Sequence, residues 1–99
     1  MPAAITDTYE ICQQRHAHYA SQGFSSADCY ERLATDPKIP PLLKGPVCAK
    51  IVDVKPEAFA MRRQRGQEPP YVSISSNAVR YPREDFFRWL ARRLRGGSA

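Results

Sequence analysis

Residues 69–95, PPYVSISSNAVRYPREDFFRWLARRLR, contain the pattern that decides the fold of this chain. Residues 71–74 and 78–81 form two strand-like runs, and a short polar segment, Ser75-Ser76-Asn77, separates them. Asn77 is suited to the positive φ of a tight turn. We therefore expect a small β-hairpin, which needs a helix to pack against because a hairpin alone is only marginally stable.

That helix is predicted to follow directly, because Pro82 suits a helix start. Phe86, Trp89 and Leu90 lie on one face of it and are expected to close the core behind the hairpin. Another face carries arginines at i, i+4, i+7 spacing, namely Arg88, Arg92 and Arg95. Glu84 stands four residues before Arg88, so this pair can also form an ordinary surface ion pair.

Two shorter helices are predicted before the hairpin. Pro46 suits the first turn of the earlier one and Pro56 the first turn of the later one, with a tight turn expected at residues 53–55. The later segment, PEAFAMRRQR, ends in arginines before Gly66, as expected at the negative end of a helix dipole. Two short helices joined by a short turn form a helix-turn-helix pattern.

The N-terminal part is predicted to be helical as well. Residues 7–10 have the form of a capping box, in which Asp7 accepts from the amide three residues on, and a helix follows to about Ser21. Ser25 and Ser26 can cap a second helix that runs to Ala34, and prolines then break it. We expect a mainly α fold with a small β-hairpin wing: a helical extension at 1–41, a winged helix-turn-helix at 42–95 and a flexible tail at 96–99.

Charge is distributed unevenly. Residues 55–99 hold ten Lys or Arg against four Asp or Glu, while residues 1–54 hold five against six. Nearly all the bases in the second half are arginines, whose planar fork suits phosphates and guanine edges. This pattern favours a nucleic-acid partner, although a solvated basic surface explains it too. There is no membrane-spanning run and no secretory signal, so a cytoplasmic, nucleoid-associated location is expected.

Catalysis and metal binding are not expected. Cys12 and His16 lie one helical turn apart, with His18 and Cys29 as further ligand candidates, but the paired Cys-x-x-Cys spacing of a zinc site is missing. Three cysteines at irregular spacing do not predict a disulfide framework. The sequence contains no Gly-rich phosphate loop. We therefore expect no cofactor and no enzymatic activity.

Three elements in order, LLKGPVCAKIVDV, KPEAFAMRRQRG and PPYVSISSNAVRYPREDFFRWLARR, resemble the excisionase-like winged helix-turn-helix proteins of the MerR superfamily. Excisionases, also called recombination directionality factors, belong to this group. Residues that fit the family pattern are Leu42, Leu43 and Ala49 of the entry helix, Pro70, Arg80-Tyr81, Asp85 and Trp89-Leu90. The resemblance covers about residues 42–93, and the chain departs from it at Gly45-Pro46 and over the N-terminal forty residues.

The resemblance implies that the second helix, residues 55–65, enters the major groove and that the hairpin contacts phosphates or the minor groove. The DNA-binding candidates are Lys55, Glu57, Arg62, Arg63, Arg65, Ser75, Ser76, Asn77, Arg80 and Arg92. Phe59 is expected in the core instead, and Met61 between core and groove. Ordinary turn chemistry also accounts for the serines and Asn77, and a solvated helix end for Arg62, Arg63 and Arg65.

The function implied is sequence-specific, architectural DNA binding by an excisionase. Several protomers would associate along double-stranded DNA at an attachment site, bend it, and direct a site-specific recombinase (integrase) towards excision. A transcriptional regulator with the same DNA contacts remains an alternative, because the fold alone does not separate the two. A second alternative is a protein-interaction module in which the arginines meet an acidic protein.

Overall fold

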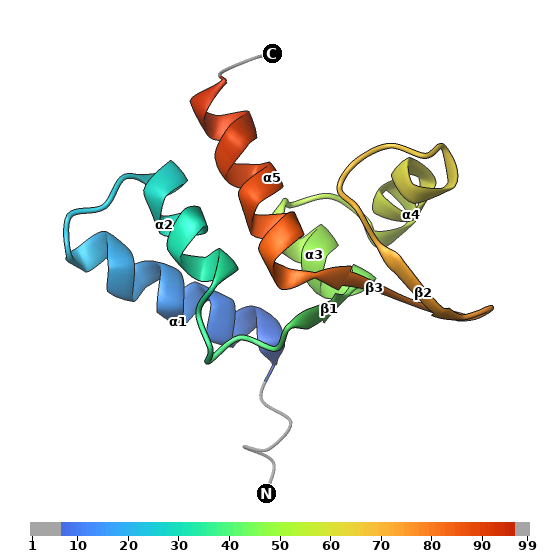
Figure 1. Ribbon diagram of the computed structural model, residues 1–99, viewed down its shortest axis with the longest axis horizontal. Coiled ribbons are helices and arrows are strands. Elements are labelled where there is room, and N and C mark those ends of the chain that lie inside the picture. The colour runs from blue at the N-terminus through green and yellow to red at the C-terminus, as the bar shows by residue number, and fades with distance from the viewer. Residues whose placement is uncertain (1–6, 97–99) are drawn as a thin grey trace, which may run out of the picture.

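The computed structural model describes residues 7–96 and contains, over that range, five helices and one small antiparallel sheet (Figure 1). The elements in chain order are α1 (Thr8–Ser21), α2 (Ser26–Ala34), β1 (Leu42–Lys44), α3 (Gly45–Ile51), α4 (Pro56–Gln64), β2 (Val72–Ser75), β3 (Ala78–Pro82) and α5 (Arg83–Arg95). The expectation of a mainly α chain with a small β element is confirmed. Of the tail predicted at 96–99, Gly96 caps α5 and the rest lies outside the described residues.

The two N-terminal helices begin close to their predicted caps. The Ser25 side chain accepts from the amide of Asp28 at 3.2 Å, which satisfies one of the unpaired donors at the start of α2. The capping-box geometry predicted for α1 is wrong in one respect. Asp7 Oδ1 accepts from the amide of Tyr9, at 3.0 Å, and not from that of Glu10. The cap is thus one residue tighter than the box pattern requires.

Helices α3 and α4 follow the proline pattern, with Pro46 and Pro56 in their first turns. The turn between them passes through Asp53, whose φ of 61° makes it a non-glycine residue in the left-handed region. Asp53 can adopt this conformation because its short polar side chain tolerates it. Gly66, with a φ of 71°, lies directly after the C-cap of α4.

Strand β1 was not predicted, and the assignment of Leu42 and Leu43 to an entry helix is wrong. Strand β1 pairs antiparallel with β3. Leu42 lies opposite Pro82, Leu43 opposite Tyr81 and Lys44 opposite Arg80. The sheet therefore has the order β1-β3-β2, with the hairpin as its outer part. Because β1 is only three residues long, its strand character comes from this distant pairing and not from its own sequence.

The predicted hairpin is present, with a shorter turn than expected. Ser75 pairs with Ala78, so the strands are joined by Ser76 and Asn77 alone. The register shifts between Ser73 and Ser75, and this irregularity leaves Ile74 as an extra residue on β2. Asn77 does not have the positive φ that was predicted for it.

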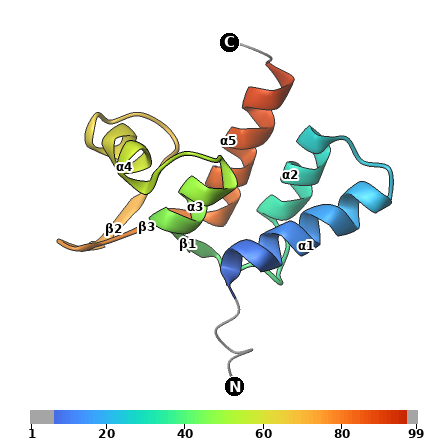
Figure 2. The same cartoon turned by 180° about the vertical axis from the view of Figure 1, so that it is seen from behind.

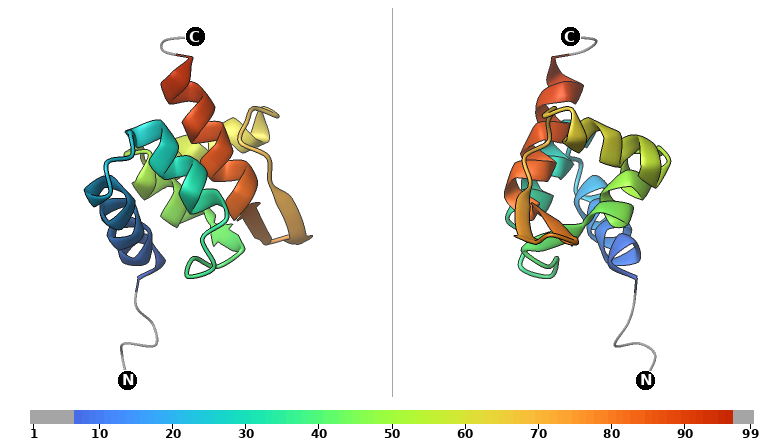
Figure 3. Two further views of the ribbon diagram at one scale, coloured as in Figure 1. Left: turned by 60° about the vertical axis from the view of Figure 1, so that its left-hand side comes forward. Right: turned by 90° about the vertical axis from the view of Figure 1, so that its right-hand side faces the viewer.

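One hydrophobic core joins the N-terminal helices to the rest of the chain. It contains Cys12, Leu33, Ala34, Ile39, Leu43, Cys48, Ala49, Phe59, Tyr81, Phe86, Phe87 and Trp89. Helix α2 runs alongside α5 (Figure 3, left), and α5 with α3 stands between the N-terminal pair and α4 with the hairpin (Figures 1 and 2). The core therefore contains residues from both sides of the predicted division at residue 42, and that division stays a prediction.

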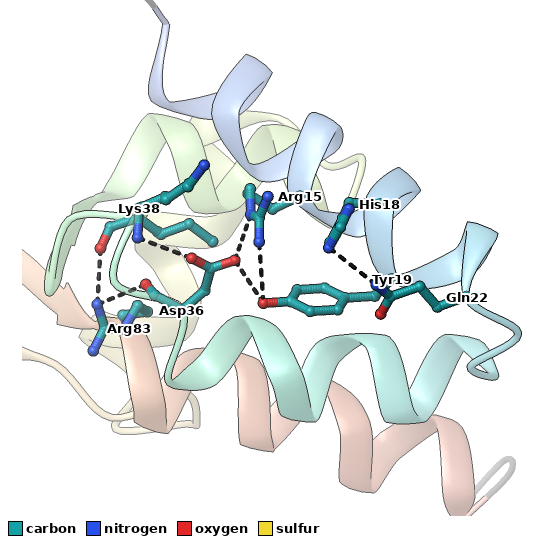
Figure 4. Close-up of polar contacts among 8 residues, drawn as sticks. Arg15, His18, Tyr19, Gln22, Asp36, Lys38 and Arg83 are labelled. Carbon is teal, nitrogen blue, oxygen red and sulfur yellow. Dashed lines mark hydrogen bonds and ion pairs between the residues drawn. The ribbon is translucent and has the colours of Figure 1, made fainter.

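A polar network fixes the loop that leaves α2 (Figure 4). The buried Asp36 accepts from Arg15 Nε at 2.6 Å, from the Tyr19 hydroxyl at 2.9 Å and from the amide of Lys38 at 2.8 Å. On the other side, Arg83 donates to the loop carbonyls of Ala34, Asp36 and Ile39 at 2.8–3.0 Å. The network thus connects α1 to the start of α5.

No helix among residues 7–96 has the length and apolar content needed to cross a membrane.

Candidate nucleic-acid interface

Helix α4 presents a polar outer surface on a single buried anchor. Phe59 is 2% exposed and packs against Tyr81, with ring centroids 5.1 Å apart, so it holds α4 onto the sheet as predicted. Lys55 caps the helix at its N-terminus, Glu57 follows in the first turn, and both are exposed. Met61 is 44% exposed. The outward surface of α4 is therefore available to a partner over its whole length.

A cleft of about 240 Å³ brings together basic residues from three elements. Lys44 comes from β1, Arg63 from α4 and Arg80 from β3, and Asn77 of the hairpin turn lies at the same cleft. The remaining lining residues are Gly45, Pro46, Val79 and Tyr81, so no acidic residue takes part. None of the three basic side chains has a carboxylate partner in the described part of the chain. The cleft is thus a local concentration of positive charge that favours an anion.

One lining residue of this cleft carries a buried polar group without a partner. Tyr81 is 1% exposed, and its hydroxyl is the one buried side-chain polar atom among residues 7–96 that lacks a hydrogen bond. Arg80, the preceding residue, donates from Nη1 to the carbonyl of Val79 at 3.0 Å. A buried hydroxyl left unpaired costs free energy, and a bound acceptor would remove that cost.

The three arginines at the end of α4 point in different directions. Arg62 points towards α5: its Nε donates to the carbonyl of Glu68 at 2.9 Å, and its guanidinium lies 5.4 Å from the centre of the Trp89 ring. Arg63 lines the basic cleft, and Arg65, at the C-cap, is exposed. Arg62 is therefore held against α5 by its Nε and its stacked guanidinium plane, whereas Arg63 faces the cleft and Arg65 is exposed.

The arginine stripe of α5 forms ion pairs with carboxylates of the chain itself. Arg95 binds Asp28 at 2.6 Å and Glu31 at 2.7 Å, both on α2. Arg88 lies 3.4 Å from Glu84, as predicted, and Arg92 lies 3.6 Å from Glu68. Carboxylates of the chain itself neutralise this stripe, so Arg92 is a weaker candidate for DNA than its sequence position indicated.

The hairpin tip is exposed, but one of its polar groups is already engaged. Ser75, Ser76 and Asn77 are all exposed, and Ser73 Oγ donates to the carbonyl of Ser75 at 3.1 Å. The apolar side chain with the greatest exposed fraction near the tip is that of Ile74, at 59%. The tip is therefore a mixed polar and apolar surface.

Sequence reasoning missed Lys44 and Tyr81 as members of the cleft. Lys44 reaches it because β1 pairs with β3, which sets Lys44 opposite Arg80. Tyr81 was noted only as part of the resemblance. Basic residues on either side of Gly45-Pro46 and the Arg80-Tyr81 pair were visible in the sequence, but only the pairing of the strands connects them.

The cysteine and histidine candidates lie on two helices. Cys12, His16 and His18 belong to α1, and Cys29 belongs to α2; both cysteines are buried. Burial, followed by the nearby charges of Asp36 and Asp7, raises the pKa of the Cys12 thiol to about 12. His16 packs against the Tyr30 ring, and His18 lies on the exposed side of the helix. Among residues 7–96, no group of three or more His, Cys, Asp or Glu side chains is arranged to hold a metal ion.

Comparisons of this chain with protein-family models, with curated proteins and with solved structures give no match.

Proposed function

We propose that β1, α3, α4 and the hairpin form a winged helix-turn-helix that binds double-stranded DNA. The observation that carries this proposal is the basic cleft of Lys44, Arg63 and Arg80, which lacks any acidic neighbour and lies between α4 and the hairpin. A helix with an exposed outer surface beside a cationic cleft is the arrangement by which a recognition helix and a wing hold a duplex.

In this proposal the cleft binds one backbone phosphate and so fixes the register of α4 in the major groove. Lys55, Glu57 and Arg65 then lie on the exposed surface of the helix, where they reach base edges or neighbouring phosphates. The hairpin tip, with Ser76 and Asn77, contacts the adjacent backbone or the minor groove. Arg62 supports α4 from inside the molecule and is not assigned a base contact.

The biological role that we propose is that of an excisionase. Several protomers would bind repeated sites beside an attachment site, and the resulting bend would favour excision by a site-specific recombinase. The concentration of arginine in residues 55–99 and the basic cleft support a role that works through contacts with the DNA backbone. A transcriptional regulator would use the same contacts at a promoter, so the location of the binding site distinguishes the two roles.

The test is a gel-shift titration on tiled duplexes from the DNA that flanks the gene, repeated over a series of salt concentrations. Discrete stepwise shifts on one tile, which weaken steeply with salt, are expected for specific binding by several protomers. Binding that is uniform over all tiles contradicts sequence-specific recognition, and no binding contradicts the proposal as a whole. A tile at an attachment site indicates excision, and a tile at a promoter indicates regulation.

Two substitutions assign the binding to the cleft. Arg63→Ala and Arg80→Ala are each expected to weaken binding by roughly tenfold and to lower the slope of log affinity against log salt by about one. Arg95→Ala removes the same charge from α5, where Asp28 and Glu31 neutralise it, and is expected to leave affinity unchanged. Equal effects of all three substitutions would show that net charge alone governs binding.

A further inference from the structure

A second concave surface is lined by residues of α2, α3, α4 and α5 and of the turn that joins α3 to α4. It is a groove of about 410 Å³. Phe59, Trp89 and Leu90 belong to its lining, and two apolar residues at its edge are strongly exposed, Val54 at 43% and Leu94 at 50%. Large apolar side chains left exposed around a groove are typical of a binding surface.

Two arginines of the same groove are stacked on its tryptophan. The guanidinium carbons of Arg62 and Arg93 lie 5.4 Å and 5.2 Å from the centre of the Trp89 ring. Stacking of this kind holds the guanidinium plane in place while its edge N–H groups remain available as donors, apart from the Arg62 Nε–H, which the Glu68 carbonyl accepts. The groove therefore has an apolar base and fixed cationic donors beside it.

These two arginines differ from their neighbours on α5. Arg88, Arg92 and Arg95 each have a carboxylate of the chain within 4.0 Å, whereas neither Arg62 nor Arg93 has one in the part of the chain that the structure describes. The chain thus neutralises Arg88, Arg92 and Arg95 of α5 and leaves unneutralised the two arginines that line the groove.

We propose that this groove binds an acidic amphipathic helix of a partner protein. Apolar side chains of such a helix would fill the groove over Trp89 and Leu90, and its carboxylates would accept hydrogen bonds from Arg62 and Arg93. This is a function additional to DNA binding and does not depend on it. With both surfaces in use, the protein would hold a partner protein beside a DNA site.

Other occupants fit the groove less well. A DNA backbone would satisfy the arginines but would leave Val54, Leu90 and Leu94 against a charged, hydrated ligand. In a second copy of this chain, the exposed apolar residues of β2, Val72 and Ile74, have only tyrosine and serine as sequence neighbours, so they bring no carboxylate to the arginines. Charge and apolarity together are matched by an acidic amphipathic segment.

Trp89 allows a direct test, because it is the single tryptophan of the chain. The full-length protein would be titrated with a tryptophan-free helical peptide that carries leucines on one face and glutamates beside them. A saturable change in Trp89 emission is expected. A peptide with lysines in place of the glutamates, and a scrambled acidic peptide of the same charge, are both expected to bind at least roughly tenfold more weakly.

Variants locate the site. Arg93→Glu is expected to weaken the acidic peptide by more than tenfold and to strengthen the lysine peptide, a reversal that loss of folding cannot produce. Lys38→Ala, which removes one exposed charge from the loop after α2, is expected to bind like the parent protein. Unaltered binding by Arg93→Glu overturns the proposal, as does equal binding of the scrambled peptide.

The remaining outcomes also decide the matter. If an oligonucleotide changes Trp89 emission and Arg93→Ala reduces DNA affinity while the peptide has no effect, the groove belongs to the nucleic-acid interface and the proposal is wrong. If Trp89 emission changes on dilution of the protein alone, a second copy occupies the groove instead. The peptide titrations and the dilution measurement do not require DNA binding, so DNA binding can fail in the gel-shift test while the groove proposal holds.

Discussion

Arg15 Nε lies 2.6 Å from Asp36 Oδ2, in a pair whose carboxylate side chain is fully buried while the arginine is 20% exposed. Two further donors, the Tyr19 hydroxyl and the amide of Lys38, complete the coordination of this carboxylate. A buried charge is tolerated only when it is paired and hydrogen-bonded. The pair therefore holds the N-terminal helix against the loop that leads to the sheet, and with it the whole N-terminal part of the core.

Asp36→Asn is expected to lower the free energy of unfolding by about 3 kcal/mol at neutral pH, because it leaves Arg15 without its counter-charge at a largely buried position. Urea denaturation followed by circular dichroism measures this change. Asp28→Asn, which removes a carboxylate from the surface pair with Arg95, is the matched control and is expected to cost less than about 1 kcal/mol. Equal losses in the two variants would contradict the assigned role of Asp36.

The same group predicts how stability depends on pH. Burial by itself would raise the pKa of the Asp36 carboxyl, but the hydrogen bonds from Arg15, the Lys38 amide and Tyr19 outweigh it and hold the pKa below its ordinary value. The stabilisation is therefore complete above the unfolded pKa of about 3.9 and is lost as pH falls through the lower folded value. Urea denaturation at pH 6 and at pH 3 measures this loss. The free energy of unfolding of the parent protein is expected to fall more between these pH values than that of the Asp36→Asn variant.

Arg83 is predicted to be irreplaceable by lysine. It donates through Nε and Nη1 to three carbonyls of the 34–39 loop, a geometry that a single ammonium group cannot reproduce. Arg83→Lys is expected to lower the free energy of unfolding by about 2 kcal/mol. Arg88→Lys, at an exposed position of the same helix, is the control and is expected to change it by less than about 0.5 kcal/mol. Chemical denaturation of both variants decides the point.

Local signals were sufficient to predict most of the fold. The serine cap of α2, the prolines at the starts of α3 and α4, and the alternation of the hairpin each act within a few residues of the element that they define. Phe86 and Trp89 are buried as the helical spacing of α5 predicted. These elements could be read from the sequence because their physical causes are local.

The rest depends on pairings between distant residues. Strand β1 exists because Leu43 meets Tyr81, and the α5 stripe is neutralised because Arg95 meets Asp28 and Glu31 of α2. Periodicity places an arginine on the outer face of a helix, but it contains no information about which carboxylate lies opposite. For this reason the sequence identified Arg63 and Arg80 as candidates, gave no sign of the carboxylate of Glu68 beside Arg92, and did not reveal the contribution of Lys44 to the cleft.

The cysteines are expected to be unreactive in the folded protein. Cys12, Cys29 and Cys48 are all buried, and burial raises the pKa of each thiol, to about 12 for Cys12. Because the thiolate is the reactive species, an aromatic disulfide reagent at pH 8 is expected to label none of them until the protein unfolds. Labelling followed by mass spectrometry measures this in native buffer and in denaturant. Rapid native labelling of one thiol would mean that its part of the core opens locally.

Tyr81→Phe separates stability from binding at the basic cleft. Removal of a buried hydroxyl that has no partner is expected to raise the free energy of unfolding by about 1 kcal/mol. If that hydroxyl donates to a bound phosphate, the same substitution weakens DNA binding by roughly tenfold. The variant is then more stable than the parent protein and binds DNA more weakly. Tyr71→Phe, at a position that is 42% exposed and outside the cleft, is the control for both measurements. A Tyr81→Phe variant that binds DNA like the parent, while Arg63→Ala does not, would show that the cleft holds its anion through the basic side chains alone.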